Sequence, residues 1–250
     1  MKKSIQIIAT AFSILLGNAG FSQNDTMYVN YGGNVTIAIP TSKIDSLTFY
    51  RPNITPSITD ADGNVYTSVT IGTQEWVSEN LRTTKYTDGT VIPNVTGNTD
   101  WDNLSTGAWC NYNNSSSNDA IYGKLYNWYA VETGKLCPTG WHVPTDAEWN
   151  VLTNYLAANG HSGTEATALK STSGWSGSGN GTDDYGWNGL PGGVRFGNGN
   201  FYGIVGNGLW WSYSVDVPFK YRHLAYDKDA SFTASAPFER NGFSVRCLRD

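Results

Sequence analysis

The sequence predicts an α+β domain that combines two or three short helices with a twisted, mostly antiparallel sheet and long loops. Three observations favour this fold class. Helical periodicity is confined to a few short segments, whereas alternating apolar runs of strand length recur along the chain. Glycine (28 residues), tyrosine (15) and tryptophan (10) are abundant, and only 15% of the residues are charged. This composition is typical of a loop-rich extracellular fold in which aromatic residues build the core and glycines shape the turns.

Residues 1–22 have the pattern of a signal peptide. Lys2 and Lys3 form a positive start, and the apolar run 5–16 is too short to span a membrane. Small residues in 20–22 predict cleavage directly after them, and no cysteine lies nearby to carry a lipid anchor. We therefore expect an exported protein, secreted or held at the extracellular surface, without a membrane span.

Residues 23–56 are predicted to be a small leader and linker. Two alternating runs, 27–31 and 35–39, flank a glycine-rich turn and predict a β-hairpin. The run 43–49 resembles the end of a short leader common in exported proteins of Bacteroidetes-type bacteria. The hairpin is too small to hold a core of its own, so the main domain is expected to cover 57–250.

The main domain opens with two predicted strands, 65–72 and 74–77, which meet at a tight glycine corner. The preceding segment 60–64 begins like a calcium-binding loop, with acidic and amide residues around a glycine. Such a loop needs a bidentate acidic residue at its twelfth position, where this chain has Ile71. A turn shaped by the Asp-Gly pair is therefore favoured. The sequence predicts no cofactor; a loop could hold a calcium ion, but no recognised motif supports one.

The strongest helix prediction begins at Thr145. Thr145 and Glu148 have the spacing of a capping box, and the Asn-Gly pair 159–160 is expected to end the helix. The residues expected to form its buried stripe are Trp149, Val151, Leu152 and Leu156. Two weaker helices are expected over 124–131 and 165–170.

The rest of the chain is predicted to be strand and loop. The stretch 98–118 is rich in Asn, Ser and Asp and is expected to be loop, apart from a short apolar element around 108–110. The best strand segments that follow the helices are 186–195, 200–205, 209–215 and 243–248. They complete the sheet of the predicted α+β domain.

No catalytic or metal-binding motif accompanies these elements. His142, His161 and His223 are not paired at the spacing of metal ligands, so structural or solvent-exposed roles are favoured and no metal site is predicted. The sequence has no nucleophile elbow, phosphate-binding loop or zinc-protease helix motif. Asp183 and Asp184 could bind a cation or a sugar hydroxyl, although a solvated turn is favoured. The net charge of −5 and the pI near 5.1 argue against nucleic-acid binding.

Trp210 and Trp211 are the most ambiguous pair of residues. Alternate residues of a strand face opposite sides, so one tryptophan is expected in the core and its neighbour is expected to point outward. An outward ring could stack on a sugar, whereas the alternative is that loops cover it. The candidate ligand-binding residues are Asp183, Asp184, Trp187, Tyr202, Trp210, Trp211 and Tyr213.

Several short motifs are spread along the main domain. They are 62–66, 71–76, 79–81, 122–128, 137–145, 190–193, 210–212 and 242–249. Through these motifs the chain resembles the Fibrobacter succinogenes major paralogous domain family over residues 60–250. Members of that family are exported and have no assigned biochemical activity, so the resemblance implies export but no reaction.

Two segments also resemble the formylglycine-generating enzyme family. The segment 144–149 is similar to a helix-opening motif of that family, and 242–247 is similar to its closing motif. The resemblance implies a C-type-lectin-like fold and a disulfide between Cys137 and Cys247, which leaves Cys110 as a buried free thiol. The enzyme activity does not carry over, because it needs a further reactive cysteine pair and no cysteine lies between Cys137 and Cys247.

The sequence therefore favours a secreted, non-catalytic binding module that recognises a glycan or another cell-surface ligand. One alternative is a structural or adhesive surface component whose 24–52 unit adds strands to a partner. A third hypothesis is an unrecognised enzyme. It requires a concave site in which Asp183, Asp184, Arg195 or His223 lie within hydrogen-bond reach of one another.

Overall fold

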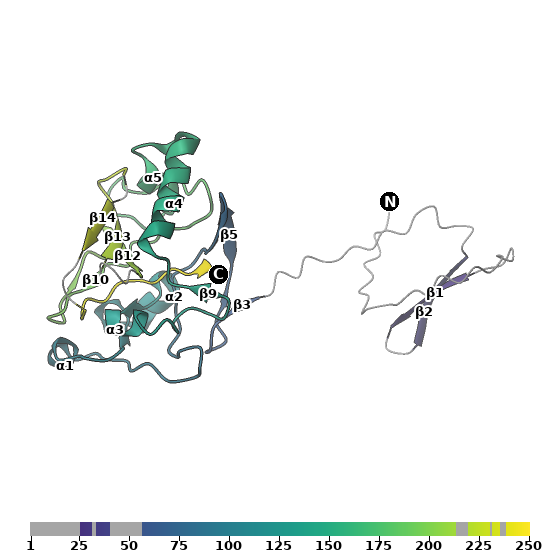
Figure 1. Cartoon of the computed structure of the whole chain (residues 1–250), viewed down its shortest axis with the longest axis horizontal. Helices are drawn as coiled ribbons and strands as arrows, with labels where there is room; N and C mark the ends of the chain where they lie inside the picture. Colours follow the sequence, from purple (N-terminus) through teal and green to yellow (C-terminus); the bar gives the residue numbers. More distant parts are fainter. Residues whose placement is uncertain (1–25, 32–33, 41–56, 214–219, 231, 236–238) are drawn as a thin grey trace. The chain divides into compact units, whose positions relative to one another are not determined.

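The computed structural model describes most of the chain. The described residues are 26–31, 34–40, 57–213, 220–230, 232–235 and 239–250. The predicted signal peptide and the run that resembles a bacterial leader lie outside them. The chain divides into two compact units, Met1–Pro56 and Ser57–Asp250 (Figure 1).

The first unit contains one pair of strands. Strands β1 (Thr26–Tyr31) and β2 (Asn34–Pro40) run antiparallel, with a shift in register between Val29 and Asn30. The two strands predicted for this segment are confirmed. Two strands alone are too few to bury a core.

The second unit holds the remaining strands. They are β3 (Ile58–Thr59), β4 (Val65–Tyr66), β5 (Ser68–Ile71), β6 (Gln74–Val77), β7 (Trp109–Cys110), β8 (Leu125–Tyr126), β9 (Trp141–His142), β10 (Val194–Arg195), β11 (Phe201–Tyr202), β12 (Asn207–Ser212), β13 (Lys220–Ala225), β14 (Phe232–Ser235) and β15 (Leu248–Arg249). A four-stranded sheet has the order β5-β6-β15-β9, and a three-stranded sheet has the order β12-β13-β14. The pairs β3-β4, β7-β8 and β10-β11 complete the set, and in the described part of the chain all these strand pairs are antiparallel.

The helices are few and short. They are α1 (Asn98–Asp102), α2 (Asp119–Tyr122), α3 (Trp128–Val131), α4 (Asp146–Leu156) and α5 (Glu165–Leu169). Two 3-10 turns, η2 (Tyr112–Asn114) and η3 (Ser116–Asn118), and a π-helical segment, η4 (Ala157–His161), accompany them. The unit is therefore a mixture of antiparallel sheet and few helices, as the sequence predicted. The helix α1 lies inside the stretch 98–118 that was predicted to be loop, so that expectation is wrong for this segment.

Helix α4 forms where the sequence predicted it. The side chain of Thr145 accepts a hydrogen bond from the backbone of Glu148, and the Glu148 carboxylate accepts one from the backbone of Thr145. Trp149, Leu152 and Leu156 are buried as expected. The prediction that Val151 is buried is wrong, because two residues on from Trp149 the helix has turned by about 200° and the side chain faces water.

The helix predicted over 124–131 begins later, at Trp128. Residues Leu125–Tyr126 form β8 instead, which pairs with β7. Asn127 explains the boundary, because its side chain accepts a hydrogen bond from the backbone of Ala130 and caps α3 in an extended conformation. The expectation of a helix over 124–127 is therefore wrong.

The strands predicted after the helices are shorter than expected. In the segment 186–195 only β10 is a strand, because Gly186, Asn188 and Gly193 adopt positive φ angles of 69°, 52° and 70° that interrupt an extended run. The segment 200–205 keeps only β11.

Other strand predictions differ at their ends or are absent. The strand predicted over 65–72 divides into β4 and β5. In the segment 243–248 only its last residue is in β15. Strands β13 and β14 were not singled out from the sequence.

Two large hydrophobic clusters form the core of the second unit, and helix α4 covers one of them. That cluster, here called the α4 core, includes Trp76 of β6, Trp149 of α4, Trp187 and Trp210 of β12. Figure 1 shows α4 beside strands β12 and β13. The second cluster packs around Trp211 and includes the Cys137–Cys247 disulfide.

The predicted disulfide is confirmed. Cys137 and Cys247 are bonded, with their Cα atoms 5.9 Å apart, across a sequence separation of 110 residues. Cys247 directly precedes β15, and Cys137 lies shortly before β9. Cys110 is a buried free cysteine, as expected. In the described ranges, no helix has the length and apolar character needed to cross a membrane.

Candidate functional site

The structure corrects the orientation expected for the tryptophan pair. Trp210 and Trp211 are both 0% exposed, so the prediction that one of them points outward is wrong. Their rings do face opposite sides of β12, but each side carries a core: Trp210 belongs to the α4 core and Trp211 to the disulfide-containing cluster. Neither indole has a face open to a ligand at the surface.

Two other predicted aromatic residues also pack inside the domain. Trp187 is buried, with its ring 5.0 Å from that of Trp210 in an edge-on contact. Tyr213 is half-buried and stacks on Trp128 at 6.1 Å. Tyr202 differs from them, because 63% of its surface is exposed.

The paired carboxylates shape a turn. The Asp183 carboxylate accepts a hydrogen bond of 2.7 Å from the backbone of Asn188, and partial burial raises the pKa of Asp183. Asp184 accepts a hydrogen bond from the hydroxyl of Thr182 and lies 3.6 Å from His161. These contacts account for both side chains without a ligand.

The residues required by the enzyme hypothesis bind different partners. Arg195 is completely buried and donates to backbone carbonyls, whereas the His223 ring lies 2.7 Å from the amide oxygen of Asn207. Burial lowers the pKa of His223 to about 4, so the ring is neutral near pH 7. Asp183 and Asp184 are held in the turn described above. The four groups do not assemble one site through these contacts.

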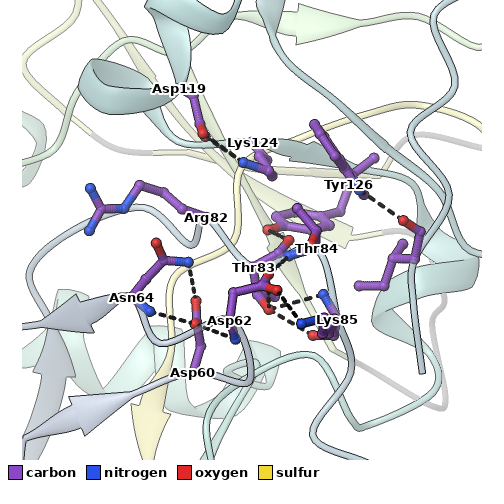
Figure 2. A network of polar contacts seen from close by, with 12 residues as sticks. Asp60, Asp62, Asn64, Arg82, Thr83, Thr84, Lys85, Asp119, Lys124 and Tyr126 are labelled. Carbon is purple, nitrogen blue, oxygen red and sulfur yellow. Dashed lines mark hydrogen bonds and ion pairs between the residues drawn. The ribbon is translucent and has the colours of Figure 1, made fainter. Parts of the chain in front are cut away.

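The segment 60–64 forms the predicted turn (Figure 2). The Asp60 carboxylate accepts hydrogen bonds from the backbones of Asp62 and Asn64 and from the hydroxyl of Tyr66. Asp62 pairs with Lys85 at 3.2 Å. Both carboxylates are thus engaged within the protein. Among the described residues no group of three acidic, histidine or cysteine side chains is arranged to hold a metal ion.

Exposed aromatic residues gather in a segment that the sequence analysis only partly identified. Phe196, Tyr202 and Tyr226 are 41%, 63% and 47% exposed. Among the residues whose side chains the structure describes, they are the exposed aromatic residues. Val205 between them in sequence is also exposed. These four residues are called the aromatic face below. For Phe196, Tyr202 and Val205 the signal available from sequence was their position in the glycine- and asparagine-rich segment 196–208, and Tyr226 lies outside it.

Phe196 and Tyr202 form the centre of the aromatic face. Strands β10 and β11 pair Val194 with Tyr202. The hairpin turn closes because the backbone of Phe196 donates to the carbonyl of Asn200 and accepts from the backbone of Gly199. This register makes Phe196 and Tyr202 diagonal neighbours across the hairpin. Their rings stack at 6.1 Å with an angle of 25° between planes. The two rings therefore present one broad apolar surface to water.

Arg195 holds this hairpin from the inside. Its guanidinium donates to the carbonyl oxygen of Gly199 in the hairpin turn and to those of Val95 and Thr96 in a distant loop. It also lies 4.3 Å from the centre of the Trp101 ring. The hairpin is therefore tied to the segment around residues 95–98, which restricts the motion of the exposed rings.

The same arginine lies near the free thiol. Burial raises the pKa of Cys110 to about 12, although Arg195 opposes the shift. The sequence offered no basic residue near Cys110, because Arg195 is brought there only by folding. The thiol stays protonated near pH 7, which makes it a poor nucleophile.

Exposed amides border the stacked rings. Asn198 and Asn200 lie in the turn next to Phe196, and the amide of Asn98 approaches that of Asn200 at 3.5 Å. Amides can donate and accept hydrogen bonds at the same time. The surface around the rings thus offers both kinds of polar contact beside an apolar one.

A backbone turn supports the remaining part of the aromatic face. Val205 has a φ of 59°, an unusual value for a β-branched residue, and its backbone binds Pro191 and Ser176. The backbone of Tyr226 donates to the carbonyl of Gly206 in the same turn. These bonds hold the backbones of Val205 and Tyr226 at the turn that follows β11.

A second surface feature is a groove of about 480 Å³ between the β5–β6 hairpin, the start of α4 and β15. Glu75, Glu148, Arg249 and Asp250 are among its lining residues. At its edge, His142 is held between Asp250 at 2.8 Å and Glu148 at 3.0 Å. Burial opposes the charged ring, but the hydrogen bonds to the two carboxylates prevail and raise the pKa of His142. The structural role favoured for His142 agrees with these contacts.

Comparison with known protein families places the chain in one of them. The model of the Fibrobacter succinogenes major domain family matches residues 69–249, which confirms the resemblance stated from the sequence. Neither the curated proteins nor the solved structures contain a match. The relationship therefore identifies a family without adding a reaction or a ligand.

Proposed function

Because the chain belongs to the Fibrobacter succinogenes major domain family, for which the match names no activity, we propose its function from its own surface: a secreted, non-catalytic module that binds glycans. Export through the signal peptide 1–22 is part of the proposal. The Cys137–Cys247 disulfide supports it, because such bonds persist in oxidising compartments. A C-type-lectin-like architecture is also proposed, on the motifs around residues 144 and 242.

The observation that carries this proposal is the stacked, exposed pair Phe196 and Tyr202. The two neighbouring rings expose apolar surface to water, and folded proteins usually bury such surface. The apolar C–H face of a sugar ring can cover such a surface, while its hydroxyl groups bind the amides of Asn198 and Asn200. This combination of an apolar platform and a polar border suits a carbohydrate better than a purely apolar ligand.

The rigid support of the pair favours recognition. The buried contacts of Arg195 hold the hairpin before any ligand arrives. Less conformational freedom is then lost on binding, which improves affinity for a small contact area.

A glycan array tests the proposal with the full chain and two variants. Tyr202→Ala removes the more exposed ring, and we expect it to reduce binding of the recognised glycan by about tenfold or more, because ring stacking supplies much of the contact area. Ile121→Ala is the matched control, since Ile121 is 56% exposed on a different segment. The control should bind like the unchanged protein.

Two outcomes would contradict the proposal. An array and a pull-down of host surface proteins that both stay blank with folded protein would leave no binding function. A recognised glycan whose binding is equal for the unchanged protein and Tyr202→Ala would place the binding site elsewhere, with the groove beside His142 as the next region to mutate.

A structural or adhesive role is the second proposal. Strands β1 and β2 form a two-stranded sheet in the first unit, so in the described residues each has an edge without a partner strand. Such edges can pair with a strand of another protein. Deletion of residues 26–40 should then reduce retention at the cell surface, and unchanged retention would count against this role.

A further inference from the structure

A small cavity lies inside the α4 core, away from the aromatic face. Its volume of about 10 Å³ is enough for one water molecule or one small ion. Trp149 of α4, Trp187, Trp210 of β12 and Arg222 of β13 are among the residues that line it. The cavity thus lies where the helix meets the three-stranded sheet.

The lining residues carry hydrogen-bond donors that no protein group satisfies. The indole nitrogens of Trp149 and Trp187 and two guanidinium nitrogens of Arg222, Nε and Nη1, are buried without a partner. These three residues are 2%, 1% and 3% exposed. All four atoms are donors only, so an acceptor is what the site requires.

The local charge favours an acceptor with a negative charge. Arg222 and Lys220 both pair with the carboxylate of Asp146, at 3.1 and 2.9 Å, which leaves one positive charge in excess within this group. The guanidinium of Arg246 lies 4.1 Å from the centre of the Trp187 ring. Of the residues that line the cavity, Arg222 carries the charge, and a positive charge beside the cavity favours an anion over a neutral species.

We propose that the cavity binds a single halide ion, chloride under ordinary conditions, held by Trp149, Trp187 and Arg222. A water molecule can accept about two of the four donors, whereas a halide accepts from all of them. The ion links α4, the segment around Trp187 and β13. It therefore acts as a structural ligand of the folded domain, independent of what the aromatic face binds.

The first test is a comparison of thermal unfolding of the full chain in sodium chloride and in sodium gluconate at equal ionic strength. Chloride should raise the melting temperature by about 2 to 4 °C, because an ion that binds only the folded state stabilises it. Trp187→Phe keeps an aromatic ring but removes one donor, and its melting temperature should differ little between the two salts. Trp76→Phe is the matched control: it alters the same core, but the Trp76 indole already binds Gln74, so its response to chloride should remain.

The second test needs no variant. Crystals of the unchanged protein soaked in bromide should show an anomalous peak within hydrogen-bond distance of Trp149, Trp187 and Arg222. Density without an anomalous signal, together with equal melting temperatures in the two salts, would overturn the proposal and assign the cavity to water. A peak at this position would support it even if the Trp187→Phe variant failed to fold.

Discussion

Arg195 is one residue on which the arrangement of the aromatic face depends. It is completely buried and satisfied by carbonyl oxygens of Gly199, Val95 and Thr96. Lysine cannot reproduce this pattern, because an ammonium group lacks the planar fork of the guanidinium. The charge at this position is therefore less important than its geometry.

We predict that Arg195→Lys lowers the free energy of unfolding by about 2 to 4 kcal/mol, because buried carbonyls lose their donors. Urea unfolding followed by tryptophan fluorescence measures the change. Arg249→Lys is the control, since the Arg249 side chain is 49% exposed and should tolerate the exchange. Equal stability of the two variants would show that the contacts of Arg195 do not matter.

His142 should make stability depend on pH. Asp250 and Glu148 raise its pKa above the ordinary value of 6.5 in the folded protein, against the effect of burial. Its contribution is then fully present below pH 6.5 and is lost as the pH rises through the folded pKa. We expect His142→Gln to lose more stability at pH 5.5 than at pH 8.5, as measured by urea unfolding at both values.

His223 provides an opposite case. Burial lowers its pKa to about 4, so the neutral ring is favoured in the folded state. The folded protein resists protonation of His223, so this residue lowers the stability of the fold as the pH falls from 6.5 towards 4.

The test of His142 has a clear negative result. If His142→Gln and the unchanged protein show the same dependence of stability on pH, the assignment to His142 is contradicted.

At the scale of secondary structure, elements defined by local side chains were predicted best. Helix α4 follows from the capping box of Thr145 and Glu148, which involves only neighbouring residues. The start of α3 was missed because Asn127 caps it while β8 takes part in a strand pair with a distant segment. Strand β10 is short because Gly193 and its neighbours adopt conformations that composition alone does not reveal.

We predict that Thr145→Ala lowers the free energy of unfolding by about 1 kcal/mol through loss of the cap of α4. Thermal or urea unfolding measures this effect. Val151→Ala lies on the exposed face of the same helix and should change stability by less than about 0.5 kcal/mol. A larger loss for Val151→Ala than for Thr145→Ala would contradict the assignment of the two helix positions.

At the scale of the molecule, the resemblance to a known family predicted what local patterns could not. The Cys137–Cys247 disulfide joins segments 110 residues apart and was expected from related motifs. The burial of both Trp210 and Trp211 was not expected, because a strand pattern does not show that cores cover both of its faces. Of the aromatic face only Tyr202 was among the predicted residues, since exposure is decided by the segments that pack nearby.

We predict that the double variant Cys137→Ser, Cys247→Ser loses about 4 to 5 kcal/mol of stability at most, because the unfolded chain regains the freedom of a long loop. Guanidinium unfolding compares it with the unchanged protein. Cys110→Ser should also lower stability, because it buries a hydroxyl group. This variant keeps the Cys137–Cys247 disulfide, so a reductant should lower its stability further. Equal stability of the double variant and the unchanged protein would contradict a stabilising disulfide.

Strand β15 lies between β6 and β9 in the four-stranded sheet, although it follows both in sequence. The ribosome therefore synthesises β6 and β9 long before β15, the strand that pairs with both. Until β15 is made, β9 has no strand that connects it to β6, and the long-range pairing of the sheet cannot form. The four-stranded sheet is therefore completed only when almost all of the domain has been made.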